Sequence, residues 1–302
     1  MKLTEKFKFD EEKTLDGSQI ETIHIDTSST DVTIKPSTND QVIVHYYGHG
    51  NDKGIEGNDF TIQQQASALS IMIKQIPMIR FGIVFIDAHL DVLLPPKLFK
   101  QLHMKTSSGD IHLNQINCEQ VKLEATSGEI EAIHINSNRL SINTTSGDID
   151  LQEGKSKQLS LRTTSGEISV ENVFSQDLSA QSTSGDIELN HFIGENITLK
   201  ATSGEIKGTY IIGNVQANTS SGDVDFYFKE ISPQTFIHTS SGDVTVRTEQ
   251  NPSIRLSFST SSGEFTDENG NTFEQKKFQK VYGRGEHSLS VKTSSGDFEF
   301  DM

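Results

Sequence analysis

One short phrase, Ser-Gly followed by an acid and preceded by Ser or Thr, recurs ten times between residues 104 and 300. The spacings between its glycines are 19, 19, 19, 19, 19, 18, 20, 21 and 33 residues. A fixed period near 20 residues is typical of a solenoid, in which each repeat is one structural unit stacked on the last. The ten glycines are Gly109, Gly128, Gly147, Gly166, Gly185, Gly204, Gly222, Gly242, Gly263 and Gly296.

The apolar positions around each glycine predict two strands per repeat. Residues five before and two after the glycine are apolar in all ten copies, and the residue seven before is apolar in nine, with Thr235 as the exception. Alternation of apolar and polar residues is the period of a strand with one buried face. Because the two strands are out of phase, the chain must bend at Ser-Gly, where glycine supplies a left-handed or strained backbone and the hydroxyls bond the turn's amides. An apolar residue seven after the glycine, such as Ile116, indicates a second bend and a short third side.

These patterns predict an all-β protein, a right-handed parallel β-helix or β-solenoid of about ten to twelve coils with an atypical N-terminal β cap. The short repeat cannot bury a face alone, so successive coils must stack as parallel strands. We assign residues 1–100 to the β-rich cap, continuous with the solenoid, and residues 101–302 to the repeats, with a hairpin insertion near 265–286.

The N-terminal residues carry weaker versions of the same pattern. Residues 20–34 contain the phrase with Thr30 in the place of glycine, which predicts a first, cap-like coil because terminal repeats are atypical. The other expected features are a strand over 42–47, a loop over 48–54, a hairpin from 60–65 and 69–73, a buried strand or cap over 81–86, and a strand over 90–94 that ends at Pro95-Pro96.

The long last spacing predicts an insertion between the final two coils. Asn269-Gly270 is typical of a tight hairpin, and residues 282–285 indicate a second turn. The last coil, which ends at residues 298–302, is expected to leave an open edge protected by charges.

The charge balance excludes several partners. The formal net charge is -16, and lysines and arginines form no cluster of the kind that binds phosphates, so we expect no nucleic acid or anionic lipid partner.

No stretch approaches 18 apolar residues, so no membrane insertion is expected. With one cysteine and no apolar signal segment at the start, the default location is cytoplasmic.

The acid that follows each glycine is the main candidate for a binding site. Stacked coils would align these carboxylates in a column about 5 Å apart, where like charges repel, and the alternation of Asp and Glu would stagger them. They could serve only as acceptors for the amides of the turn, or form a strip that binds Ca²⁺ or a cationic peptide. The column comprises Asp110, Glu129, Asp148, Glu167, Asp186, Glu205, Asp223 and Asp243.

No other residues suggest chemistry, so we expect no catalytic residue, no metal site and no cofactor. The ten histidines show no zinc spacing and are interpreted as solvated loop residues. Cys118 is placed in the turn after Ile116 as an incidental small residue. Serines and threonines of successive turns are expected to stack and to bond one another along the stack.

The repeated Thr-Ser-Gly-Asp-Ile phrase, the segment Leu90-Asp91-Val92-Leu93-Leu94-Pro95 and the Gly283-Arg284-Gly285 element before the last phrase resemble the bacterial putative-adhesin family of β-strand-repeat proteins. The resemblance covers essentially the whole chain. It implies a right-handed β-helix, a domain of unknown function without catalytic residues, a link to cell-envelope stress systems and a cell-surface location.

Three functions follow as hypotheses. The first is a non-catalytic scaffold or adhesin-like binding protein that engages a protein partner through its long faces. The second is a binder of cations or cationic peptides that uses the carboxylate column. The third is a carbohydrate-active β-helix enzyme, since such folds carry acid pairs on one face.

Overall fold

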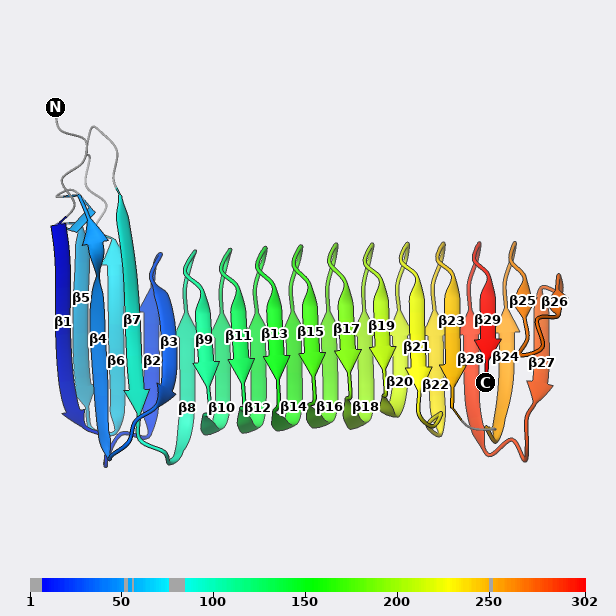
Figure 1. Ribbon diagram of the computed structural model, residues 1–302, viewed down its shortest axis with the longest axis horizontal. Coiled ribbons are helices and arrows are strands. Elements are labelled where there is room, and N and C mark those ends of the chain that lie inside the picture. Colours follow the sequence, from blue (N-terminus) through cyan, green and yellow to red (C-terminus); the bar gives the residue numbers. More distant parts are fainter. Residues whose placement is uncertain (1–6, 52–53, 56, 76–84, 250–251) are drawn as a thin grey trace. The chain divides into compact units, whose positions relative to one another are not determined.

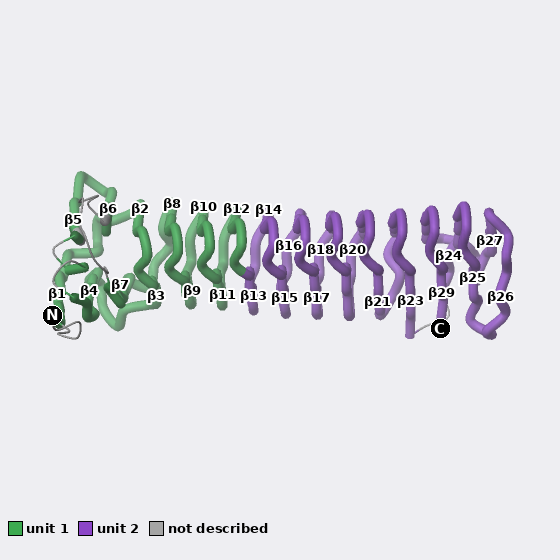
Figure 2. Tube along the Cα trace, turned by 90° about the horizontal axis from the view of Figure 1, so that it is seen from above, with its two compact units in different colours: residues 1–147 green, residues 148–302 purple. Residues whose placement is uncertain are grey.

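The computed structural model describes residues 7–51, 54–55, 57–75, 85–249 and 252–302. The regular elements are β-strands, labelled β1 to β29 in chain order. The chain divides into two compact units, residues 1–147 and 148–302, which Figure 2 colours separately. Within each unit the strands form two largely parallel sheets, as a β-solenoid requires (Figure 1).

In unit 1, one sheet has the order β1-β4-β7-β3-β9-β11 and the other the order β12-β10-β8-β2-β6-β5. Strands β1, β4 and β7 pair antiparallel, as do β5 and β6, and the remaining pairs are parallel. The strands are β1 (Phe7–Asp16), β2 (Thr22–Thr27), β3 (Asp31–Pro36), β4 (Gln41–Gly50), β5 (Asn58–Gln65), β6 (Ala68–Gln75), β7 (Ile86–Leu94), β8 (Leu98–Lys105), β9 (Ile111–Asn114), β10 (Asn117–Glu124), β11 (Ile130–Ile133) and β12 (Asn136–Asn143).

In unit 2, one sheet has the order β13-β15-β17-β19-β21-β23-β29-β25-β26 and the other the order β27-β24-β28-β22-β20-β18-β16-β14. The strands are β13 (Ile149–Gln152), β14 (Lys155–Arg162), β15 (Ile168–Glu171), β16 (Phe174–Gln181), β17 (Ile187–Asn190), β18 (Ile193–Lys200), β19 (Ile206–Thr209), β20 (Ile212–Asn218), β21 (Val224–Phe228), β22 (Gln234–His238), β23 (Val244–Thr248), β24 (Ile254–Ser259), β25 (Phe265–Thr266), β26 (Thr272–Phe273), β27 (Lys277–Val281), β28 (His287–Lys292) and β29 (Phe298–Asp301).

Each regular repeat consists of one short and one long strand joined by two corners. In the repeat of Gly109, β9 is followed by Gln115 in the left-handed region (φ 55°), by the buried Ile116, and then directly by β10. The predicted short third side is therefore wrong, because the second strand starts immediately after this corner. The left-handed corner residues are Gln115, His134, Glu153, Asn172, His191 and Tyr210.

Equivalent apolar side chains of successive coils stack in the core. Ile111 pairs with Ile130 in unit 1, and Ile168 pairs with Ile187 in unit 2, all of them buried. The polar exception in the column seven before the glycine, Thr235, is also buried, and its hydroxyl has no hydrogen-bond partner among the described residues. Burial of apolar area between the two sheets is the main stabilising term of such a core.

The glycines of the phrase are required by close approach rather than by an unusual φ. The positive-φ glycines among the described residues are Gly213, Gly270, Gly283 and Gly285, none of which belongs to the phrase. A Cβ on Gly128 would instead lie 1.9 Å from the carbonyl oxygen of Gly109, and one on Gly185 would lie 1.7 Å from that of Gly166. The prediction that these glycines supply a left-handed backbone is therefore wrong: the missing side chain lets the neighbouring coil stack.

At the start of unit 1, the coils do not follow the order of the sequence. The coil of β2 and β3 lies between the coil of β6 and β7 and the coil of β8 and β9, so the prediction that residues 20–34 form the terminal coil is wrong. The expected 60–65 and 69–73 hairpin is confirmed as β5 and β6. Strand β4 continues through Gly48 to Gly50, where a loop was expected. Gly48 permits the close approach of β4 to β7 at this point, since a Cβ there would lie 2.1 Å from the Asp87 carbonyl oxygen. The strand expected over 81–86 falls mostly outside the described residues.

At the end of unit 2, the last coil in sequence is also not last in space. Strands β28 and β29 are inserted between β22 and β24 and between β23 and β25, so the expected open edge at the C-terminal coil is wrong. The hairpin insertion occupies the edge instead, with β26 and β27 antiparallel to their partners. Five phenylalanines pack together in this region: Phe258, Phe265, Phe273, Phe278 and Phe298.

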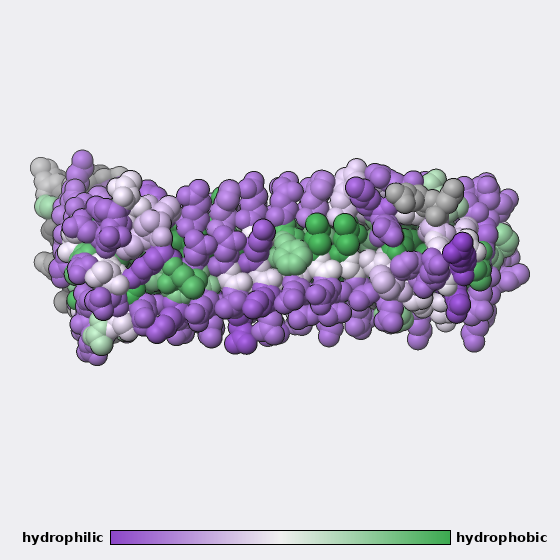
Figure 3. All heavy atoms as spheres, turned by 90° about the horizontal axis from the view of Figure 1, so that it is seen from below, coloured by the Kyte–Doolittle hydropathy of each residue, from purple (hydrophilic) through white to green (hydrophobic). Residues whose placement is uncertain are grey.

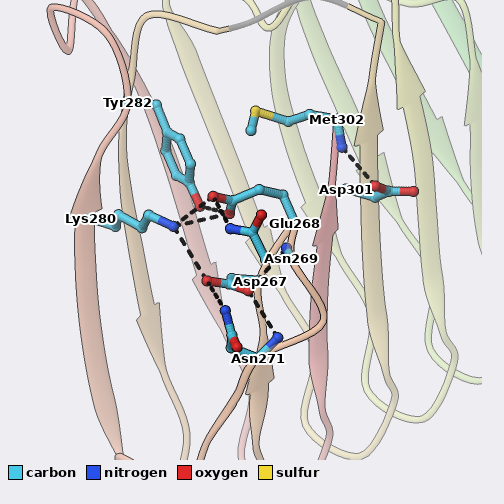
Figure 4. A network of polar contacts seen from close by, with 8 residues as sticks. All are labelled: Asp267, Glu268, Asn269, Asn271, Lys280, Tyr282, Asp301 and Met302. Carbon is cyan, nitrogen blue, oxygen red and sulfur yellow. Dashed lines mark hydrogen bonds and ion pairs between the residues drawn. The ribbon is translucent and has the colours of Figure 1, made fainter.

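A polar network fixes the insertion (Figure 4). The buried Asp267 accepts the amides of Asn269 and Asn271, so the Asn-Gly hairpin has a five-residue loop, 267–271, rather than a tight turn. Lys280 donates to Glu268 Oε1 at 2.7 Å, and Tyr282 donates to Glu268 Oε2 at 2.5 Å. Burial and the hydrogen bond to Glu268 raise the pKa of Tyr282 to about 12.

Replacing Gly185 by Ala tests the stacking constraint. The added Cβ would meet a backbone carbonyl of the adjacent coil, which cannot rotate away, so we expect a loss of about 3 kcal/mol or more in the free energy of unfolding. Urea denaturation followed by circular dichroism measures the loss. Ser184→Ala, at the exposed neighbouring position, is the matched control. Equal stability of the two variants would contradict a steric role for the glycine.

Candidate functional site

The corner around most phrase glycines is held by a buried hydroxyl three residues earlier, whereas Gly128 and Gly204 have alanine at that position. In unit 1, the Gly147 amide donates to Thr144 Oγ1 at 3.1 Å, and that hydroxyl donates to the Gly128 carbonyl at 3.4 Å. In unit 2, Ser182 makes the same two contacts, with Gly185 and Gly166. The hydroxyl thus links its own turn to the preceding coil. The predicted hydroxyl-to-hydroxyl stacking is replaced here by bonds to backbone.

The aspartates of the acid column bond the backbone of the adjacent coil. The Glu129 amide donates to Asp110 Oδ1 at 2.9 Å, and the Glu205 amide donates to Asp186 Oδ1 at 2.7 Å. A short acid can reach this amide, and the charge strengthens the bond. The same contact recurs with Asp31, Asp148, Asp223, Asp243 and Asp297 as acceptors. These aspartates therefore belong to the stacking interface as well as to the surface.

The glutamates of the column lie among other carboxylates. Glu167 is largely exposed, and the desolvation of its covered part, followed by the charges of Glu188, Asp186 and Asp148, raises the pKa of its carboxyl. Glu205 is balanced by Lys207, whose Nζ lies 2.8 Å from Glu205 Oε2. The column in unit 2 is thus a crowded line of negative charge, only locally neutralised.

The histidines and the cysteine lie in different places from those expected. Most histidines are in strands, not loops: His24 of β2 and His103 of β8 pair, with ring centroids 4.9 Å apart. Cys118 lies inside β10 rather than in a turn, and its burial raises the pKa of the thiol to about 11. No group of three or more His, Cys, Asp or Glu suited to a metal ion occurs within the described ranges.

A stripe of exposed apolar side chains lies at the second corner of three successive coils in unit 2. Phe174, Ile193 and Ile212 open β16, β18 and β20, pair with one another in register, and are 44%, 45% and 43% exposed. Figure 3 shows the hydrophobic patch in the middle of the face that it views. Beside this apolar stripe, the rings of His191 and Tyr210 stack at 4.7 Å. The stripe gathers apolar area that the fold itself does not bury.

The sequence carried a signal for the apolar stripe. Its residues stand eight after the glycine, a position that Asn117, Asn136 and Lys155 fill in the preceding repeats. The change from polar to apolar over three consecutive repeats is therefore a departure from the repeat pattern. Exposed apolar patches of this kind mark interaction sites more often than isolated exposed residues do.

A family model matches residues 20–211 and 195–300, which together include most of the chain. This chain belongs to the Toastrack DUF4097 family. The family match confirms the resemblance to bacterial adhesin-like repeat proteins inferred from the Ser-Gly-acid phrase. No curated protein matches the sequence. Across the described segments of this DUF4097 protein, no helix is long and apolar enough to cross a membrane.

Solved structures similar to this DUF4097 protein include the following three. A putative adhesin from Parabacteroides merdae has 13% identity and a TM-score of 0.49, with 97% of this chain and 96% of that chain covered. A putative adhesin from Bacteroides fragilis has 14% identity, a TM-score of 0.43 and coverage of 80% and 97%. A putative lipid binding protein from Parabacteroides distasonis has 14% identity, a TM-score of 0.49 and coverage of 97% of both chains.

Two substitutions of Asp186 separate its hydrogen bond from its charge. Asp186→Ala removes the acceptor of the Glu205 amide, so we expect a loss of about 1–2 kcal/mol in the free energy of unfolding. Asp186→Asn keeps an acceptor oxygen and removes the charge, so it should lose less than half as much. Urea denaturation measures both, with Glu188→Ala as a control acid outside the column. If both variants were as stable as the parent protein, the aspartate would not be part of the stacking interface.

Proposed function

We propose that this protein is a non-catalytic, adhesin-like binding protein that engages a protein partner at the cell envelope through the apolar stripe. The observation that carries the proposal is the stripe itself: three large side chains in successive coils are more than two fifths exposed. Full burial of each against a partner would contribute about 1.5–3 kcal/mol per side chain, less the part already buried.

The architecture suits such a role. We propose that the scaffold is a right-handed solenoid of about ten to twelve coils, as the crossover rule for parallel strands favours. Stacked coils present side chains of one repeat position at regular intervals, so three adjacent substitutions create a continuous surface. The aspartates of the column bond backbone amides, which favours a structural over a catalytic use of those carboxylates.

A triple variant tests the apolar stripe. Phe174→Asn, Ile193→Asn and Ile212→Asn together should leave the fold intact, because asparagine fills the same repeat position at Asn117 and Asn136. We expect binding of the labelled protein to a cell-envelope fraction from its native host to weaken at least about tenfold. Protease treatment of that fraction should abolish the binding.

Leu98→Asn provides the control for this experiment. Leu98 is 63% exposed and pairs with Asn117 in the same repeat position, but it lies outside the apolar stripe. The control should bind as the parent protein does. Equal binding by the triple variant, or no binding by the parent protein, would contradict the proposed function.

The acid column supports a second candidate function, the capture of a cationic peptide. Its specific observation is the crowding at Glu167, where desolvation and, after it, the charges of Glu188, Asp186 and Asp148 raise the pKa of the carboxyl. We expect a polylysine peptide to bind weakly at low salt and to be released at high salt, because a diffuse field is screened. Calorimetry at two salt concentrations measures this, with Glu167→Gln and Glu188→Gln expected to weaken binding. Binding that persists at high salt, or no binding at low salt, would contradict this candidate. A parallel titration of the protein with Ca²⁺ measures whether the column binds that cation.

A further inference from the structure

The repeat loses its regularity over three coils in unit 2. The spacing changes from 19 residues to 18, 20 and 21 between Gly204 and Gly263. The pairing of β18 with β20 shifts register between Ile193 and Asn196, and Gly213 adopts a φ of 145° there. Local breaks in a ladder re-aim side chains and are frequent beside functional sites.

A shallow groove lies on the outer face of the sheet over these coils. Its volume is about 460 Å³, within the range of small-ligand sites, and it crosses β18, β20, β22 and β28. The eleven residues that line it are all uncharged, in a chain whose formal net charge is -16. Its lining includes Asn196, Asn214, Gln216, Gln234, Phe236 and Ser290.

The amides of the groove retain hydrogen-bonding capacity. Asn196 Nδ2 donates to Asp177 at 2.9 Å, and Asn214 Oδ1 accepts the Gln234 backbone amide at 3.2 Å. Each side-chain amide has two donor hydrogens and an acceptor oxygen with two lone pairs, so these bonds leave further positions for a ligand. A neutral ligand with several hydroxyl groups could use donors and acceptors at once.

Phe236 provides the apolar element of the groove. It is 39% exposed and stands in register with Gln216 on one side and Ser290 on the other. A flat, partly exposed ring among neutral amides and hydroxyls matches a sugar, which has C–H groups on its faces and hydroxyls around its edge. The lining has no lysine or arginine, so it does not suit a polyanion, and no carboxylate, so it does not suit a cationic peptide. Its polar side chains do not suit an acyl chain.

We propose that this groove binds a neutral oligosaccharide, with the ring of Phe236 packed against a sugar face and the surrounding amides bonded to sugar hydroxyls. Four adjacent strands about 4.8 Å apart span about 14 Å, so the site takes a short stretch of a chain rather than a single sugar. The groove is a site separate from the apolar stripe and adds a carbohydrate ligand to the proposed binding protein.

Phe236→Ser tests the site. Serine occupies the equivalent strand position at Ser290, so the variant should fold normally, which circular dichroism and the unfolding midpoint verify. The full-length protein is applied to an array of neutral and uronic-acid-containing oligosaccharides, and a bound neutral oligosaccharide is then titrated by calorimetry. We expect Phe236→Ser to weaken that binding about tenfold or more, and Gln216→Ala to weaken it as well, with little dependence on salt.

Phe174→Ser, the same substitution in the apolar stripe, is the matched control and should bind the oligosaccharide as the parent protein does. The proposal is overturned if no neutral oligosaccharide binds at millimolar concentration, if only uronic-acid oligosaccharides bind, or if Phe236→Ser binds like the parent. Envelope binding that depends on the apolar stripe, together with no binding of any neutral oligosaccharide, would leave the proposed function standing while this inference fails.

Discussion

The close approach of one coil's carbonyl to the next coil's glycine is the contact on which the structure of this protein depends. At 1.7 Å from the Gly166 oxygen, a Cβ at Gly185 has no space, so only glycine lets the two corners reach hydrogen-bonding distance. Once they do, the Ser184 amide donates to the Thr164 carbonyl at 2.9 Å, and the short strands on either side fall into register. The recurring glycine thus permits close contact between coils and does not act as a hinge within one coil.

The other residues of the phrase satisfy the backbone that this approach brings together. The hydroxyl three before the glycine bonds its own turn and the adjacent coil, and the aspartate after the glycine accepts an amide of the adjacent coil. Negative charge therefore accumulates along the corner as a by-product of hydrogen bonding. Surfaces that depart from the repeat are the better candidates for function, because stacking does not explain them. The apolar stripe and the groove around Phe236 are two such departures within the same unit.

The strands and the burial of their side chains could be predicted from the sequence, because the period of two is set by the pleat and the apolar positions are shared by all copies. The order of the coils at the ends could not. Ile25, Val291 and their equivalents satisfy the same pattern wherever the coil sits. Nothing in the pattern therefore says that β2 and β3 lie between the coil of β6 and β7 and the coil of β8 and β9, or that β28 and β29 lie between the coil of β22 and β23 and the coil of β24 and β25. The role of the glycines was misjudged because it depends on a contact between coils, which a single repeat does not contain.

Of the candidate site, the acid column was visible in the sequence and its hydrogen bonds were not. Whether Asp186 reaches an amide depends on the distance between coils, and whether Cys118 lies in a turn or a strand depends on where the corner residue Gln115 reverses the chain. The groove lies beside a shift in register between β18 and β20, which the 18-residue spacing indicates only as an irregularity.

Hydrogen exchange at the corners tests the stacking of coils most directly. The Ser184 and Gly185 amides lie in a turn between exposed side chains, yet they bond the Thr164 carbonyl and the Ser182 hydroxyl. Stacking predicts that the Ser184 amide exchanges about as slowly as those of the flanking strands β16 and β17, since only opening of the adjacent coil would free it. Exchange at the rate of an unprotected surface loop, with the flanking strands still protected, would contradict the account.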